Sequence, residues 1–319
     1  MEAGMLISYH VMGGKEEEKE KDIFKQAMEK LGKNNSELRL NMKITALIEN
    51  TSKGDLLNEH GLCVHISYKG KNYLLDTGAS DLFITNAKTL NIDLDEIDAG
   101  ILSHAHMDHS GGYKAFFKCN QKAKVYLRKE AKEQYYIKKL WIKKYIGLPE
   151  DLLSEYPNRF IYVTGNHKID EGVTLIAHTT KDLEKRGKAM NMYRKVYSHY
   201  QLDDFSHEQS LVFESEEGLV ILNSCSHGGI ENIIKEVKEV FPNQEILAVI
   251  GGFHLMGLLG PNTMRLSEEE VRKLGKELLS SGVKNIYTCH CTGDKAFVLL
   301  KEELGEQLQY FHTGDSLEF

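Results

Sequence analysis

The densest group of potential metal ligands in the chain lies between residues 104 and 109. This segment reads His-Ala-His-Met-Asp-His, so it supplies three imidazoles and one carboxylate. In extended backbone alternate side chains share a face, and His104 and His106 can therefore bind one ion. A sharp turn after them directs Asp108 and His109 to a neighbouring ion. Because these groups are ordinary ligands of zinc and related metals, the segment predicts two adjacent divalent metal sites.

The same segment resembles the signature of the metallo-β-lactamase superfamily, which reads His-x-His-x-Asp-His after a strand and is matched here at every position. The resemblance covers about residues 42–319. It is reinforced by Asp76 in Asp-Thr-Gly, because the superfamily carries an aspartate at a strand end that supports the metal loop. The resemblance implies an α/β fold, the αββα four-layer sandwich.

Four further motifs resemble one branch of this superfamily, the dihydropterin-ribofuranosylaminobenzene phosphate synthase-like proteins. They are Glu59-His60-Gly61, Cys225-Ser226-His227, Gly251-Gly252-Phe253-His254 and His290-Cys291-Thr292-Gly293. The branch implies phosphorylated, pterin-like compounds as substrates.

The superfamily pattern also assigns a histidine that precedes a β-hairpin to the metal centre. His207 lies just before the hairpin expected at residues 211–223, so the resemblance makes it a ligand. Two alternatives stay open: His207 is an exposed loop residue beside Asp203 and Asp204, or an acidic residue takes the ligand's place.

The aspartate that bridges both ions in many superfamily members is missing from this chain. The strand expected at Leu219–Asn223 runs into Ser-Cys-Ser-His instead, so Cys225 or His227 would fill the place. A cysteine thiolate is a good zinc ligand. In the alternative interpretation Cys225 is a small buried residue and His227 caps the helix that begins near Gly229.

The last ligand implied by the superfamily is a histidine at a strand end, and His290 occupies that position after the strand expected at Asn285–Thr288. Cys289 and Cys291 flank it, but neighbouring strand positions point to opposite faces, so we expect these cysteines to be packing residues. His254 follows the strand expected at Ile246–Ile250 and reaches the sheet edge where α/β sites collect. We expect His254 to contact substrate or transfer a proton, with a structural role as the alternative.

Two ions held in this way would produce a metal-bound hydroxide near neutral pH, with Asp108 or His254 handling protons. The nitrogen-rich site at His106 favours zinc, with manganese or iron as alternatives. The sequence therefore predicts a metal-dependent hydrolase of a small polar ester, with a phosphoester favoured. One alternative is a synthase or lyase acting on a phosphorylated pterin- or ribose-linked aromatic. The other is a metal-binding sensor without turnover.

Basic and aromatic residues gather in a segment predicted to form an inserted helical cap, at about residues 123–201. They would suit a phosphate beside a flat ring, although a solvated helix face explains them equally well. These residues are Lys185, Arg186, Tyr193, Arg194, Lys195, Tyr197, His199 and Tyr200.

The ligand segments are connected by elements that alternate in type. Strands are expected at Lys43–Ile48, Gly61–Tyr68 and Asn72–Asp76 as an antiparallel meander, followed by a helix near residues 81–90 and a strand at Ala99–Ser103. Within the cap we expect a helix at Lys129–Tyr145 and strands at Phe160–Val163 and Val173–Ala177. Alternation returns in the last third, with further strands at residues 211–214, 219–223, 246–250 and 285–288, and helices at residues 229–240, 267–280 and 295–304.

Composition limits the remaining possibilities. The chain has 319 residues and a formal net charge of -7, which argues against nucleic-acid binding through bulk positive charge. Its apolar runs are far shorter than the roughly 20 residues of a membrane span, and no signal peptide is evident, so we expect a cytoplasmic protein. The five cysteines are spread widely, which favours free thiols or metal ligands. Residues 1–41, with a helix candidate at Glu16–Leu31, are expected to form an N-terminal extension to a domain of residues 42–319.

Overall fold

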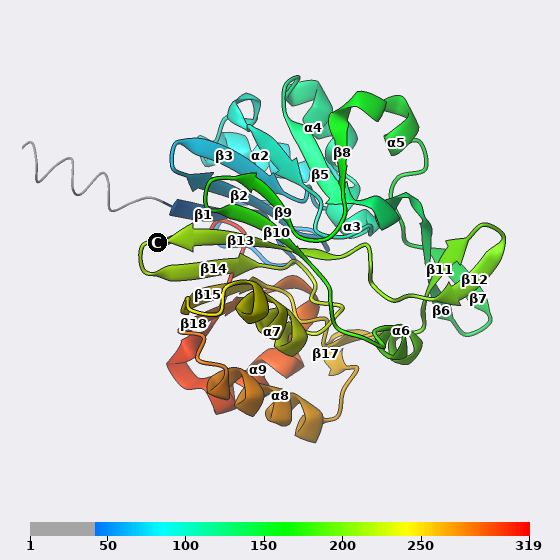
Figure 1. The fold of residues 1–319 in the computed structure, drawn as a ribbon, viewed down its shortest axis with the longest axis vertical. Coiled ribbons are helices and arrows are strands. Elements are labelled where there is room, and N and C mark those ends of the chain that lie inside the picture. The colour runs from blue at the N-terminus through cyan, green and yellow to red at the C-terminus, as the bar shows by residue number, and fades with distance from the viewer. Residues whose placement is uncertain (1–41) are drawn as a thin grey trace, which may run out of the picture. The chain divides into compact units, whose positions relative to one another are not determined.

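The computed structural model describes residues 42–319 (Figure 1). The expected extension of residues 1–41 and its helix candidate lie outside the described residues. No helix among the described residues is both long and apolar enough to cross a membrane.

Two seven-stranded sheets form the centre of the described domain. The first has the order β20-β1-β2-β3-β4-β5-β8 and the second the order β19-β18-β15-β14-β13-β10-β9. In the first sheet these strands are β1 (Met42–Ile48), β2 (Cys63–Tyr68), β3 (Lys71–Leu75), β4 (Ala99–Ile101), β5 (Lys124–Arg128), β8 (Phe160–Val163) and β20 (Ser316–Glu318). In the second they are β9 (His167–Asp170), β10 (Val173–Ala177), β13 (Gln209–Ser215), β14 (Gly218–Leu222), β15 (Ile246–Gly251), β18 (Asn285–Thr288) and β19 (Leu308–Tyr310).

Each sheet combines an antiparallel part with a parallel part. The meander β1-β2-β3 is antiparallel as predicted, and β3, β4, β5 and β8 then run parallel. In the second sheet β9, β10, β13 and β14 are antiparallel, whereas β14, β15, β18 and β19 are parallel. The carboxyl ends of parallel strands meet at one edge of a sheet, which is where α/β proteins build their sites.

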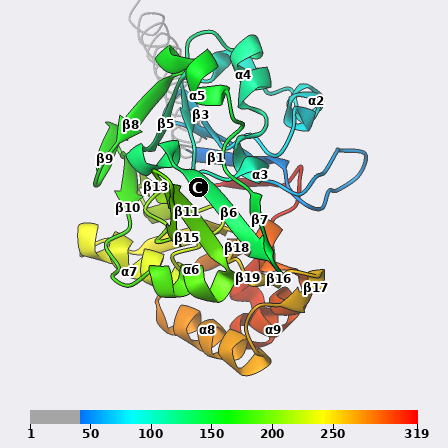
Figure 2. The same ribbon diagram turned by 90° about the vertical axis from the view of Figure 1, so that its right-hand side faces the viewer.

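The two sheets pack face to face between two layers of helices, as the αββα prediction requires. The Tyr68 and Tyr73 rings lie 5.0 Å and 5.5 Å from the ring of Phe213 on the other sheet. Helices α2 (Leu82–Thr89) and α4 (Tyr113–Cys119) pack on the first sheet, and α7 (Ile230–Val240), α8 (Glu268–Ser280) and α9 (Asp294–Leu304) pack on the second. Figure 2 shows these two helical layers on opposite sides.

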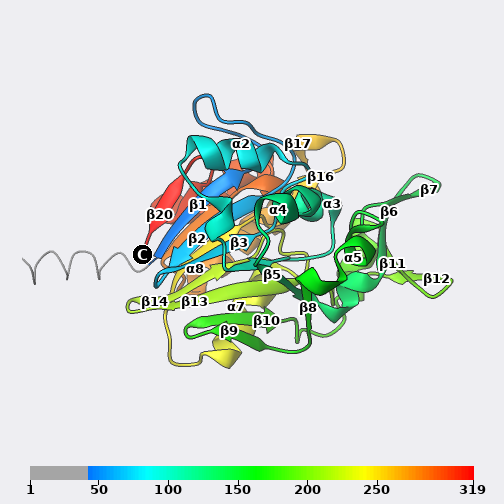
Figure 3. The same cartoon turned by 90° about the horizontal axis from the view of Figure 1, so that it is seen from above.

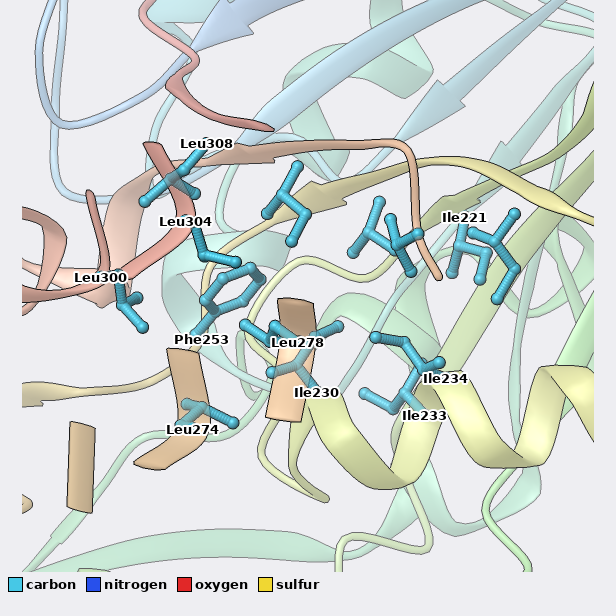
Figure 4. Close-up of a cluster of buried hydrophobic side chains, with 14 of the residues drawn as sticks. Ile221, Ile230, Ile233, Ile234, Phe253, Leu274, Leu278, Leu300, Leu304 and Leu308 are labelled. Atoms are coloured by element: carbon cyan, nitrogen blue, oxygen red, sulfur yellow. The ribbon is translucent and has the colours of Figure 1, made fainter. Parts of the chain in front are cut away.

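The outer core of the second sheet shows why α7 forms where it does. Ile230, Ile233, Ile234 and Val237 recur at helical spacing, so they form one apolar stripe. Figure 4 shows Ile230, Ile233 and Ile234 of this stripe in the same cluster as Ile221 of β14 and, from the loop after β15, Phe253. Apolar contacts of this kind contribute about 1.5 to 3 kcal/mol per fully buried side chain. The packed layer therefore fixes the loops that follow β14 and β15, which carry candidate site residues.

The prediction of a helix at Lys129–Tyr145 is wrong. The chain forms the hairpin of β6 (Gln134–Lys139) and β7 (Ile142–Tyr145), because Tyr135 and Ile137 alternate inward with a period of two. This hairpin pairs with β11 (Met192–Val196) and β12 (His199–Leu202) in a four-stranded antiparallel sheet, β12-β11-β6-β7. Figures 1 and 3 place this accessory sheet beyond the ends of the core strands.

The other strands between residues 123 and 201 belong to the two core sheets. The remaining helices are short: α3 (Met107–Ser110), α5 (Leu152–Glu155) and α6 (Glu184–Met190). The two-stranded hairpin of β16 (Met256–Gly257) and β17 (Gly260–Met264) completes the described elements used below.

Candidate metal centre

Every segment of the candidate centre follows a strand from the parallel part of a sheet. Asp76 follows β3, and the His-rich segment of residues 104–109 follows β4. On the second sheet, Cys225 follows β14, His254 follows β15 and His290 follows β18. The fold therefore brings together residues that are up to 214 positions apart, from Asp76 to His290, at adjoining sheet edges.

Three imidazoles form the first group of the centre. The ligand atoms of His104, His106 and His227 all lie within 4.8 Å of one another. The Nε2 atoms of His104 and His106 and both ring nitrogens of His227 are buried and have no hydrogen-bond partner among the described residues. Buried polar atoms are nearly always paired, so this convergence needs a ligand. A divalent ion fits it, because three histidine nitrogens are an ordinary zinc ligand set.

A second group lies beside the first and contains sulfur. The Nε2 atom of His109 is 3.3 Å from the Sγ atom of Cys225 and 3.2 Å from the Nε2 atom of His290. The Asp108 Oδ2 atom lies 3.5 Å from the His290 Nε2 atom and 3.7 Å from the His109 Nε2 atom. These residues also fit a divalent ion, in a position adjoining the three-imidazole group.

Asp76 orients this second group from a fully buried position. Its carboxylate accepts hydrogen bonds from the Ser103 backbone N–H at 2.7 Å and the Ser103 hydroxyl at 2.6 Å. It also contacts the Nδ1 atom of His109 at 2.8 Å. A carboxylate on Nδ1 fixes the imidazole tautomer and leaves Nε2 facing the centre. Asp76 therefore supports the metal loop, as the strand-end motif implied.

The electrostatics differ between the two groups. Burial, together with the neighbouring imidazoles, lowers the pKa of His104 and His227 well below the usual value, and burial lowers the pKa of His106 to about 3. Burial also acts against protonated His109, but the Asp108 and Asp76 carboxylates outweigh it and raise its pKa to about 9. The three-imidazole group is thus neutral near pH 7, the form in which histidine binds metal.

Asp108 and His60 stand at the solvent side of the centre. The His60 Nε2 atom lies 3.4 Å from the Asp108 Oδ2 atom. Burial would raise the pKa of Asp108, but His109 and a hydrogen bond from His290 outweigh it and hold this pKa well below the usual range. Asp108 is therefore a carboxylate at neutral pH, able to bind a cation or accept a proton.

His207 is brought to the edge of the cluster but is tied to protein atoms. Its Nδ1 atom accepts a hydrogen bond from the Ala105 backbone N–H at 3.0 Å, and its Nε2 atom lies 3.2 Å from Asp203 Oδ2. The residue is fully buried, so it is not the exposed loop histidine of the alternative interpretation. Ligation by His207 stays a prediction, and it would require one of these two hydrogen bonds to break.

The arrangement after β14 answers part of the question about the missing aspartate. The helix-capping alternative for His227 is wrong, because α7 begins at Ile230 after Gly229 without a side-chain cap. The Cys225 Sγ atom lies in the second group, whereas His227 lies in the first. Replacement of the bridging carboxylate by Cys225 or His227 stays a prediction, because the ligand atoms of Cys225, His227 and His254 also lie within 4.8 Å of one another.

Cys291 is a residue that the sequence reasoning missed. Strand alternation was expected to turn it away from His290, but residues 290–292 form a 3₁₀ turn and His290 has a left-handed φ of 51°. The turn brings the Cys291 Sγ atom 3.3 Å from the Cys225 Sγ atom. The signal was present in the motif His-Cys-Thr-Gly, because its Gly293 marks a turn.

A pocket of about 260 Å³ opens onto both groups. His106, Asp108, Cys225, His227 and His290 line its floor, and the ring nitrogens of His254 are buried there without hydrogen-bond partners among the described residues. The His254 ring lies 4.1 Å from the His227 ring. His254 therefore reaches the site, as predicted, with ring nitrogens free to face a bound molecule.

Three cations on the pocket wall were also missed. Lys139 and Lys144 come from the β6–β7 hairpin, and Arg265 comes from the segment after β17. The roles of Lys139 and Lys144 were missed because a helix was expected at residues 129–145. It is the hairpin that places both lysines at the pocket.

The basic and aromatic residues that were expected to bind phosphate do not line this pocket. Arg186 donates hydrogen bonds to the His227 carbonyl and the Glu231 carboxylate, and Arg194 pairs with Asp204 and Glu133. The alternative, a solvated helix face with aromatics against the core, fits only in part, because Lys185 and Arg186 lie on α6 whereas the other residues lie on β11, on β12 or between them.

A buried charged bridge fixes the loop that carries His227. His178 lies between Glu208 Oε2, at 2.7 Å from its Nε2 atom, and Glu236 Oε2, at 2.9 Å from its Nδ1 atom. Glu208 in turn accepts the backbone N–H groups of His227 and Gly228. Because the three residues come from three distant segments, their link to the metal centre was not visible in the sequence.

Comparisons with known proteins agree with this geometry. The family model for the metallo-beta-lactamase superfamily matches residues 58–185. The crystal structure of Tm1679, a metal-dependent hydrolase of the beta-lactamase superfamily, is 32% identical, with 87% of this chain and 99% of that chain covered and a TM-score of 0.73. The chain therefore belongs to the metallo-beta-lactamase superfamily, whose members usually bind divalent metals.

Two further relatives refine this result. The 7,8-dihydropterin-6-methyl-4-(beta-D-ribofuranosyl)-aminobenzene-5'-phosphate synthase of Methanocaldococcus jannaschii is 29% identical over 297 residues, which are 88% of this chain and 97% of the relative. The metallo-beta-lactamase fold protein YhfI from Bacillus subtilis is 11% identical, with 87% of this chain and 98% of that chain covered and a TM-score of 0.53. YhfI shares the fold, whereas the archaeal synthase agrees with the branch that the four sequence motifs indicated.

Proposed function

We propose that the protein is a metal-dependent synthase acting on a phosphorylated pterin- or ribose-linked aromatic. The observation that carries the proposal is a single pocket with unpartnered imidazoles on its floor and three cations on its wall. Similarity to the archaeal synthase over nearly its whole length supports a synthase over the phosphoester hydrolase favoured by the sequence alone.

The cations suit an anionic substrate. Lys139 and Lys144 are exposed at the pocket wall, and Arg265 is half-buried with an Nε atom that has no partner among the described residues. Ammonium and guanidinium groups bind phosphate oxygens through charge-assisted hydrogen bonds. We infer that these three residues hold the phosphate while the aromatic part faces His254.

The joining reaction would form a bond between an aromatic amine nitrogen and the methylene carbon of the pterin. The bond from that carbon to a weakly basic leaving group, such as phosphate, would break with its electron pair, and the amine would lose a proton. A divalent ion at the imidazole group would supply stabilisation of negative charge on a bound oxygen. We infer that His254 would accept the proton, with Asp108 as the second candidate for this role.

The test supplies a dihydropterin bearing a methylene-linked phosphate leaving group together with a ribofuranosylaminobenzene phosphate. We expect a condensed product by mass spectrometry, loss of that product after chelation, and at least a 100-fold lower rate for His106→Ala, since removing a ligand removes the charge stabilisation. Lys88→Ala, on α2, is a control that leaves the pocket intact. Metal-loaded protein that forms no condensed product would overturn the proposal.

Hydrolysis is a second candidate function, favoured by the similarity to Tm1679 and by the histidine-rich centre. A panel of phosphomonoesters, phosphodiesters and lactones separates the two reactions, because a hydrolase releases product without the aromatic amine. Tight metal binding with neither reaction would instead support the sensor.

A further inference from the structure

Two buried thiols lie side by side at the candidate centre. The Sγ atoms of Cys225 and Cys291 are 3.3 Å apart, and both residues line the pocket. Cys225 lies in the loop after β14, whereas Cys291 lies in the 3₁₀ turn after β18. Strand β15 lies between β14 and β18 in the sheet, and the loops that follow these two parallel strands present the thiols to each other.

These two thiols lie close to the imidazoles of the second group. From Cys225 Sγ to His109 Nε2 the distance is 3.3 Å, and from there to His290 Nε2 it is 3.2 Å. The ligand atoms of Cys225, His290 and Cys291 also lie within 4.8 Å of one another. Four potential donors thus lie close together, and they come from three segments: the His-rich segment, the loop after β14 and the turn after β18.

The spacing of these donors can be compared with that of a tetrahedral zinc site. With Zn–S bonds of about 2.3 Å and Zn–N bonds of about 2.0 Å, a tetrahedron separates two sulfurs by roughly 3.8 Å and two nitrogens by roughly 3.3 Å. The distances here are 3.3 Å between the sulfurs and 3.2 Å between the nitrogens. Small side-chain adjustments would therefore be enough to bring the four donors around one ion.

We propose that Cys291 joins Cys225, His109 and His290 in a two-thiolate metal position with four protein ligands, leaving the group of His104, His106 and His227 as the open position. This inference rests on the metal centre of the proposed function, but not on the reaction. Sites closed by four protein ligands hold structural metal, whereas catalytic zinc keeps three ligands and an open place. The two positions would thus divide structural and chemical roles.

The division has chemical consequences. Thiolates are soft ligands, so the closed position would select zinc over manganese or magnesium. The open position faces His254, whose ring lies beside His227, and it shares the pocket with Arg265. Asp108 is then left to pair with His60 at the solvent side, which suits proton transfer better than ligation.

Cobalt substitution under reducing conditions tests the proposal in the full chain. We expect a thiolate-to-cobalt absorption band in the near ultraviolet and two bound ions per chain. Cys291→Ala should remove roughly half of the band and weaken binding of one ion by at least 10-fold, because one of two sulfur ligands is lost. The matched control is Cys289→Ala, which removes a buried thiol two residues away and should change neither quantity.

Alkylation of wild-type protein gives an independent measurement that does not depend on how the variants fold. Removal of zinc should increase labelling of Cys225 and Cys291 together, whereas exposed Cys119 should react in both states. An unchanged cobalt band in Cys291→Ala, or zinc-independent labelling of Cys291, would overturn this inference. Absence of a condensed product would overturn only the synthase assignment.

Discussion

Stability should fall between pH 6.5 and about 10 because of the buried bridge formed by Glu208, His178 and Glu236. Burial acts against protonated His178, but hydrogen bonds to the two carboxylates outweigh it and raise its pKa to about 9. A histidine whose pKa is raised on folding contributes stability that is present below pH 6.5 and is lost as the pH rises through the folded-state value.

The size of the loss follows from the shift of the pKa. From 6.5 to about 9 is roughly 2.5 units, and at 1.36 kcal/mol per unit the contribution is about 3 kcal/mol. Little solvent screening applies, because the His178 side chain is only 5% exposed. The stability that the bridge contributes depends on the charge of His178, because Glu208 is buried. Loss of the imidazolium charge leaves the Glu208 carboxylate in an apolar environment.

Urea unfolding of the metal-free protein at a series of pH values measures this effect. We expect wild-type protein to lose about 3 kcal/mol between pH 6.5 and 10 relative to His178→Gln, which starts less stable but cannot lose the charge. The control is His167→Gln on β9, which should follow the wild-type curve. Parallel curves for wild type and His178→Gln would refute the reasoning.

Three further predictions concern the neighbourhood of the site. Asp76→Asn should destabilise the metal-free protein by about 2 to 4 kcal/mol and weaken metal binding roughly 10- to 100-fold, because the amide accepts fewer hydrogen bonds from Ser103 and His109 than the carboxylate does. Urea unfolding measures the stability and metal competition measures the affinity. The control Asp98→Asn, at an exposed position, should change neither the stability nor the affinity. Gly228→Ala should cost about 2 kcal/mol or more, because its new Cβ would lie 2.3 Å from His178, which the carboxylates hold in place; an unaltered thermal midpoint would contradict this. The single tryptophan, Trp141, is 91% exposed at the hairpin that carries Lys139 and Lys144, so binding of a phosphorylated aromatic should change its fluorescence emission. Unchanged emission while calorimetry detects binding would rule out a substrate position beside this hairpin.

The core sheets were predictable from sequence because their patterns are local. Segments rich in β-branched, Leu or Tyr residues and bounded by turn residues identify strands such as Val173–Ala177 and Asn285–Thr288, and both have the expected bounds. The helix α7 was equally clear from its apolar stripe. The accessory sheet was not, because Tyr, Ile and Lys residues in β6 and β7 fit either period when the pairing with β11 is unknown.

The candidate site, like the fold, was predictable from the sequence only in part. The segment of residues 104–109 holds four potential metal ligands within six positions, and its resemblance to a known signature was enough to identify it as a candidate metal site. Cys291 required the left-handed backbone at His290, which strand alternation does not anticipate. The bridge of His178, Glu208 and Glu236 depends on tertiary contacts between residues 30 and 58 positions apart, so no local sequence pattern indicates it.

Anomalous scattering at the zinc edge, from crystals of the zinc-loaded protein, tests the metal centre most directly. We expect two peaks, one among His104, His106 and His227 and the other among His109, Cys225, His290 and Cys291. A single peak, or density in which the three-imidazole group holds no ion, would contradict the two-position centre.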